Sequence, residues 1–297
     1  MITLCKTLNA PIKPSKVEGP TTSLTFLGIQ LDTISMEANI TDERKQSLLQ
    51  ELTVLHGRHK CTKHELLSLI GKLSFSCKIL PAGRIFLRRL IDLTTTVKHL
   101  HHHIRITTNA RLDMQWWLDF LPSWSGKTLI LESHWTFSTT MQLFTDASGT
   151  IGWGAYWSGK WLQGRWSAAQ LNMDITWKEL YAIVMAVHTW GSRWQRKKIL
   201  FHCDNFAVVN IWESGSTRAS ETMALVRLLY FAAARYNINV CIVHIDGANN
   251  IIADCLSRFK QDRFKQLVPL ANPAPDVIPA WLIQSFIDAS CSAAILV

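Results

Sequence analysis

Four acidic residues of this 297-residue chain each end or follow an apolar stretch, where a buried carboxylate would be unfavourable. They are Asp146, Glu179, Asp204 and Asp254. Desolvation of a carboxylate costs several kcal/mol unless something compensates its charge. Four carboxylates that converge in a fold would also repel one another unless cations neutralise them. Divalent cations such as Mg²⁺ prefer oxygen ligands. The hypothesis is therefore a fold that brings these four positions to one metal site.

Composition limits the classes of protein to consider. The length favours about two domains with a sizeable core, and a hydrophobic content of 48% excludes wholesale disorder. The formal net charge of +9 and the sequence pI of about 9.3 favour an anionic partner. Because the basic residues are spread along the chain, nucleic acid is favoured over a membrane only when the motifs are added.

The cysteines and apolar runs bear on the compartment. None of the seven cysteines forms a C-x-x-C pair, so reduced thiols in an intracellular protein are expected. The N-terminus lacks the apolar core of a signal peptide. The most apolar tail, 280–297, is interrupted by four polar residues, Gln284, Ser285, Asp288 and Ser290, so no membrane span is expected. The sequence does not distinguish between the cytoplasm and the nucleus as the compartment.

The first 125 residues predict a short extended segment followed by a helical domain. Residues 1–40 contain three prolines and one strand, predicted at 24–32. The helical domain, 41–125, has a helix start at Thr41 and a capping-box pattern at 62–65. Further helices are expected after the turn at 81–83 and around Trp116, ending near Pro122. The histidine run at 99–103 indicates a solvated surface segment more than a metal site.

From about residue 140 the pattern changes to alternating strands and helices. Strands are predicted at 141–146, 152–157, 160–167, 198–203 and 239–245, and helices at 176–190, 220–236 and 250–259. This order predicts an α/β (α+β) fold, a mixed sheet with helices packed against it. The predicted domain spans 140–260, and 261–297 is expected to be a C-terminal linker or tail.

Four motifs in this region resemble the ribonuclease H domain of reverse transcriptases. They are Thr145-Asp146-Ala147-Ser148, Glu179-Leu180-Tyr181-Ala182, Asp204-Asn205, and Asn250-Ile251-Ile252-Ala253-Asp254-Cys255-Leu256-Ser257-Arg258. The resemblance covers about 141–260 and implies a ribonuclease H-like, five-stranded mixed sheet. It implies that the four acids hold two Mg²⁺ ions about 4 Å apart, which Mn²⁺ could replace. It further implies hydrolysis of the RNA strand of an RNA–DNA hybrid.

The same resemblance assigns neighbouring residues. His244, ten residues before Asp254, matches a catalytic-loop histidine that assists proton transfer or product release. Asn250 matches a position near the scissile strand, while Asn205 could contact substrate or cap the next helix. Two rival acids, Asp174 and Asp246, are interpreted as loop residues.

A basic segment follows the first helix of this region. Arg193, Arg196, Lys197 and Lys198 are interleaved with two tryptophans, Trp190 and Trp194. One interpretation is a substrate-binding segment that tracks a phosphate backbone, with Arg193 and Lys197 as contacts. The other is an exposed basic turn with buried tryptophans.

The upstream half resembles other parts of retroelement reverse transcriptases. Residues 26–32 look like the primer-grip element at the end of the palm, and 62–93 like the helical thumb and connection. The overall pattern is most like DIRS-type retrotransposons, which encode a tyrosine recombinase, so the upstream polymerase domain and a downstream recombinase are expected partners. No Asp-Asp pair occurs, so polymerase activity is not expected. The alternatives are a non-catalytic nucleic-acid-binding remnant, or a fragment of a longer RNA-directed DNA polymerase polyprotein that acts only with the palm.

Overall fold

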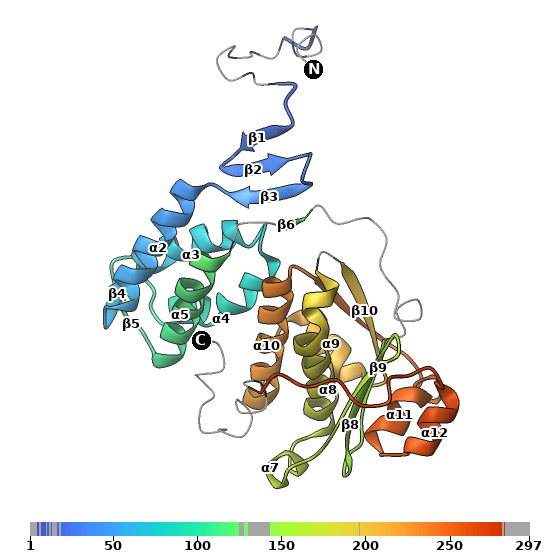
Figure 1. Ribbon diagram of the computed structural model, residues 1–297. Coiled ribbons are helices and arrows are strands. Elements are labelled where there is room, and N and C mark those ends of the chain that lie inside the picture. The colour runs from blue at the N-terminus through green and yellow to red at the C-terminus, as the bar shows by residue number, and fades with distance from the viewer. Residues whose placement is uncertain are drawn as a thin grey trace.

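The structure is a computed structural model that describes residues 19–124, 128–129, 143–195, 197–280 and 282, with 5, 7–9, 11, 13 and 17 near the N-terminus. Figure 1 shows a small N-terminal sheet, a helical unit and a larger sheet-containing unit. Every helix in this described part is too short or too polar to cross a membrane.

The N-terminal sheet corrects one prediction. The segment predicted as a single strand at 24–32 is a hairpin of β1 (Ser23–Phe26) and β2 (Ile29–Asp32). The two residues between the strands, Leu27 and Gly28, have φ angles of 51° and 78°. Two positive φ angles in a row are what a tight hairpin turn requires. The sheet continues through β3 (Glu37–Ile40) to β6 (Thr128–Leu129), and all pairings are antiparallel.

The helical unit, defined here as α2 through α5, confirms the predicted helices. It contains α2 (Asp42–His56), α3 (Lys63–Ser76), the 3₁₀ helix η2 (Pro81–Phe86), α4 (Arg88–Thr94) and α5 (Thr108–Ser123). A two-stranded ribbon, β4 (Lys60–Thr62) with β5 (His103–Arg105), closes it. Thr62 and Glu65 form the predicted capping box at the start of α3. The side chains of His99, His101 and His102 are exposed, as expected.

The sheet unit, β7 through α12, has a five-stranded mixed sheet in the order β11-β10-β7-β8-β9. Its strands are β7 (Phe144–Ala147), β8 (Gly152–Trp157), β9 (Lys160–Arg165), β10 (Lys198–Cys203) and β11 (Asn239–His244). β8 pairs antiparallel with β7 and β9, whereas β10 pairs parallel with β7 and β11. This is a ribonuclease H-like arrangement, which confirms the predicted fold class. The first two residues of the strand predicted at 141–146 lie outside the described residues.

Helices cover both faces of this sheet. On one face, α8 (Ile175–Trp190) packs against β7 and β8, and α10 (Ser220–Tyr236) packs against α8. On the other face, α11 (Ile251–Ser257) crosses β7 and β8 and is followed by α12 (Gln261–Leu267). Two helices were not predicted, α7 (Ala168–Leu171) and α12, whereas α9 (Phe206–Ser214) is the helix for which Asn205 was a candidate cap. The helix predicted at 250–259 is shorter, because Phe259 has a φ of 57° that ends it.

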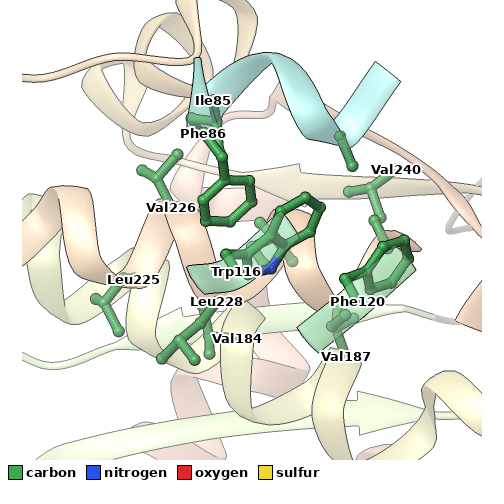
Figure 2. Packing of buried hydrophobic residues seen from close by; sticks show 14 of the residues in the cluster. Ile85, Phe86, Trp116, Phe120, Val184, Val187, Leu225, Val226, Leu228 and Val240 are labelled. Atoms are coloured by element: carbon green, nitrogen blue, oxygen red, sulfur yellow. The ribbon is translucent and has the colours of Figure 1, made fainter. Parts of the chain in front are cut away.

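The helical and sheet units share one hydrophobic core (Figure 2). Phe86 stacks on Trp116 with ring centroids 3.8 Å apart, and both face α10. At the same interface Arg227 of α10 donates to both carboxylate oxygens of the fully buried Asp113 of α5. The two units are therefore joined by packing and by a buried ion pair.

The segment after α12 lies along the edge strand β9. The backbone amides of Asn272 and Asp276 donate to the carbonyls of Gly159 and Trp161, at 2.7 and 2.9 Å. The Asp276 carboxylate accepts from the indole of Trp190 at 2.9 Å and pairs with Arg193 at 3.1 Å. This part of the predicted tail is therefore bound to the sheet unit.

Candidate active site

The four predicted carboxylates line a single open cavity of about 640 Å³. Asp146 lies in β7, Glu179 in the second turn of α8, Asp204 directly after β10 and Asp254 in α11. His202 of β10 is in register with Phe144 of β7, so the two parallel strands place Asp204 beside Asp146. The structure thus brings together residues that are up to 108 positions apart in the sequence.

Hydrogen bonds fix two of these carboxylates. Asp146 accepts from the hydroxyl of Ser257, and both residues are buried. Glu179 Oε1 accepts from the backbone amide of Ala147 at 3.2 Å. Glu179 Oε2 is buried and accepts no hydrogen bond from the described residues. A buried, unsatisfied carboxylate oxygen is costly and indicates a missing partner.

The raised pKa values of two cavity carboxylates also favour cation binding. Burial raises the pKa of Asp146 to about 6, and the negative charges of Asp204 and Asp254 add to this effect. Burial raises the pKa of Glu179 well above its usual value, again with contributions from Asp146 and Asp204. Simultaneous ionisation of these carboxylates is therefore unfavourable, and bound cations would reduce the repulsion between their charges.

The donor set fits a hard divalent cation. Ligand atoms of Glu179, Asp204 and Cys203 lie within 4.8 Å of one another. Burial is the main cause that raises the pKa of the Cys203 thiol, so this sulfur is a poor ligand near neutral pH. The remaining ligands are carboxylate oxygens, which suit Mg²⁺ and Mn²⁺.

Asp254 has a different environment. Its Oδ1 accepts from Nε of Arg258, and its Oδ2 lies 3.6 Å from Nζ of Lys260. The Asp254 side chain is 34% exposed. Two cations thus already neutralise this carboxylate.

Two other predicted residues lie at the edge of the cavity. The exposed His244 ends β11, and its ring meets the exposed ring of Phe206 edge-on at a centroid distance of 5.8 Å. Phe206 and Asn205 both line the cavity. The side-chain oxygen of Asn205 accepts from the amides of Ala207 and Val208, so it caps α9.

Asn250 is buried and links two elements that carry site residues. It is 1% exposed, and its amide nitrogen donates to the carbonyl of Thr145 at 2.8 Å. This bond ties the start of α11 to the strand that carries Asp146, which makes Asn250 a positioning residue. The rival acids lie off the cavity lining: Asp174 caps α8, and Asp246 is exposed in the loop after β11.

The basic segment lies at the opposite end of the sheet. Arg193 and Lys197 precede β10, whereas Asp204 follows it, and six strand residues span about 20 Å. Arg193 pairs with Asp276, and the side chains of Trp190 and Trp194 are fully buried. The structure therefore supports the interpretation of a basic turn with buried tryptophans. Arg196 lies outside the described residues.

Ser257, Arg258 and Lys178 are three further residues of the site for which no role was predicted. The first two belong to the quoted motif that contains Asp254, so a signal was present. Lys178 is 3% exposed, and its ammonium donates to the carbonyls of Gly149 and Leu171 at 2.7 and 2.9 Å. It thereby holds the turn after β7, and a lysine beside Glu179 gave no sign of this burial.

Comparisons with known proteins give similar structures at low identity. No family model matches the chain, and no curated protein matches it. A foamy viral protease-reverse transcriptase in complex with an RNA/DNA hybrid is 15% identical with a TM-score of 0.34, over 90% of this chain and 32% of that one. A foamy viral protease-reverse transcriptase in complex with dsDNA is 14% identical with a TM-score of 0.33, over 76% of this chain and 45% of that one. The chain thus spans about a third to a half of these structures, and the fold assignment rests on its own strand order.

Proposed function

We propose that the chain is a metal-dependent endonuclease that hydrolyses the RNA strand of RNA–DNA hybrids. The observation that carries the proposal is the convergence of Asp146, Glu179, Asp204 and Asp254 on one cavity. The net charge of +9 favours a polyanionic substrate. The motifs around these acids support the more specific proposal of the ribonuclease H part of a retroelement reverse transcriptase. The overall sequence pattern favours the DIRS type.

Asp146, Glu179 and Asp204 would hold the metal ions, with Asp254 completing the set. Two bound Mg²⁺ ions would supply an activated water and charge stabilisation at the leaving oxygen of a phosphodiester. The chain's own contribution is rigidity. Ser257 and the Ala147 amide fix the carboxylates of Asp146 and Glu179, and Asn250 fixes β7 against α11. His244, which ends β11 and contacts Phe206 of the cavity lining, would assist proton transfer or product release.

A cleavage assay with purified protein tests the proposal. We expect Mg²⁺-dependent cutting of the labelled RNA strand of a hybrid, with no cutting of duplex DNA. Asp146→Asn should abolish the cutting. Asp246→Asn is the matched control, because it removes an exposed acid from the adjoining loop that does not line the cavity. A folded wild-type protein that binds the hybrid with salt sensitivity but never cuts it would favour the non-catalytic binding remnant.

A further inference from the structure

The cavity carries more negative than positive charge in its lining. Its described lining contains four carboxylates but a single cationic side chain, that of Arg258. Arg258 directly follows α11, one helical turn after Asp254, so the two side chains lie on the same face. The chain therefore places one guanidinium beside the acids that would bind metal.

Arg258 uses only part of its hydrogen-bonding capacity on Asp254. The bond to Asp254 Oδ1 comes from Nε. The two terminal nitrogens make no hydrogen bond within the part of the chain that the structure describes, and the side chain is 46% exposed. A guanidinium presents its donors as a planar fork that matches the oxygens of a phosphate. The unused side of this fork is accessible from solvent.

Asp254 cannot bind a metal ion fully without losing these partners. Arg258 occupies one of its oxygens and Lys260 lies near the other. Glu179, in contrast, has an oxygen with no partner among the described residues. A cation that binds Asp254 must therefore compete with Arg258 for the same carboxylate.

We propose that Arg258 is an exchange residue that pairs with Asp254 in the metal-free protein and moves to a backbone phosphate of the nucleic acid when metal binds Asp254. This inference rests on the proposed function and adds a substrate contact to it. One guanidinium thus covers the acid before the substrate arrives and binds the substrate afterwards. Metal and nucleic-acid binding are coupled through this exchange.

The exchange predicts opposite effects of one substitution. Arg258→Met should increase the affinity for Mn²⁺ about threefold to tenfold, because a competing cation is lost. The same variant should raise the KM for the hybrid about tenfold, the effect expected for loss of a charge-assisted hydrogen bond. The slope of log affinity against log salt should fall by about one charge. Arg258→Lys should keep only part of the hybrid affinity, because an ammonium lacks the fork.

Lys260→Met is the matched control. Lys260 also lies near Asp254 but does not line the cavity. Its loss should increase metal affinity modestly and leave the KM for the hybrid unchanged. Hybrid binding by anisotropy in EDTA should be nearly the same for wild type and Arg258→Met, since Asp254 then holds the guanidinium.

Calorimetric Mn²⁺ titration, anisotropy in EDTA and KM in Mg²⁺ together decide the matter, with circular dichroism to confirm folding. Wild-type protein that cleaves, combined with an Arg258→Met variant of unchanged metal affinity and KM, overturns the exchange and leaves the proposed function standing. Wild-type protein that binds no metal and cleaves nothing overturns both.

Discussion

Two of the regions in which the chain buries carboxylates solve the same electrostatic problem differently. Asp113, between the helical and sheet units, is fully buried and pairs with Arg227 and, at 3.4 Å, with Arg89. Asp146, in the cavity, is nearly as buried, but among the described residues its carboxylate accepts only the hydroxyl hydrogen bond of Ser257. Burial is the largest cause that raises the pKa of both.

The charged neighbours act in opposite directions at the two sites. Around Asp113, Arg227 and Arg89 lower the pKa and oppose the effect of burial. Around Asp146, the acids Asp204 and Asp254 raise the pKa further, and the described charged group that lowers it is Arg258. A buried carboxylate is therefore structural where the protein supplies its counter-charge. It indicates a binding site where the protein supplies more negative charge.

The largest expected effect concerns catalysis at the uncompensated site. Glu179→Gln keeps the shape of the side chain but removes a charge that would bind metal under the proposed function, so kcat/KM for the hybrid should fall about a thousandfold or more. Steady-state cleavage measures this, with Asp276→Asn, remote from the cavity, as the control. A fall in kcat/KM of less than about tenfold would contradict the view that the cavity carboxylates are functional and Asp113 is structural.

The compensated site should respond in stability instead. Asp113→Asn leaves two arginine charges without their partner at the interface, one of them buried, which should lower the free energy of unfolding by about 3 kcal/mol. Urea denaturation measures the loss, while cleavage per folded molecule should stay within about twofold. An unchanged or increased stability would show that Asp113 is not held by its arginines.

At the cavity, removing charge should have the opposite effect on stability. In EDTA, Asp146→Asn should increase the free energy of unfolding near neutral pH by about 1–3 kcal/mol. The folded pKa of about 6 exceeds the unfolded value of 3.8, so the folded state binds more protons between these values. Stability from this group is thus fully present below about pH 4 and is lost as pH rises through about 6. The variant's advantage should vanish near pH 4, and an advantage that grows in acid would contradict this sign.

The smallest effect is expected at a half-exposed ion pair. Asp276→Ala removes the acceptor of the Trp190 indole and the partner of Arg193, whose side chain is 49% exposed. Because solvent screens the ion pair, we expect a loss of about 1 kcal/mol, mainly from the indole hydrogen bond. Thermal unfolding of this variant and of Arg193→Ala separates the two parts, and equal losses would show that the ion pair dominates.

Much of the sheet unit could be predicted from the sequence because its periodicity and its motifs agree. Apolar runs located all five strands, and Asp146 and Asp204 lie side by side because β7 and β10 are parallel. The chemistry of Asp146 and Glu179 was visible since charge interrupts an apolar pattern there. Asp113 gave no such signal, because it lies in a mixed helical sequence and its partner is 114 residues away.

Features that depend on tertiary contacts could not be predicted. The resemblance predicts Asn250 near the scissile strand, and its burial against Thr145 is a tertiary contact that no sequence pattern indicated. The turn of the first hairpin was not predicted because it lacks the usual Asn-Gly or Asp-Gly pair. Leu27 occupies the first turn position, where φ is positive. Helix α12 is short, and its Phe264 is buried in a small cluster that includes the rings of Tyr156 and Trp161 from the distant β8 and β9.

The central claim is that divalent cations supply the counter-charge that the cavity lacks, and Mg²⁺-dependent thermal unfolding tests it most directly. The midpoint for the wild type should rise with Mg²⁺ or Mn²⁺, and at about a hundred times Kd the gain is about 2.7 kcal/mol. Asp113→Asn should show the same gain from a lower starting midpoint, whereas Asp146→Asn should show little. Equal metal responses of the wild type and Asp146→Asn would contradict the account.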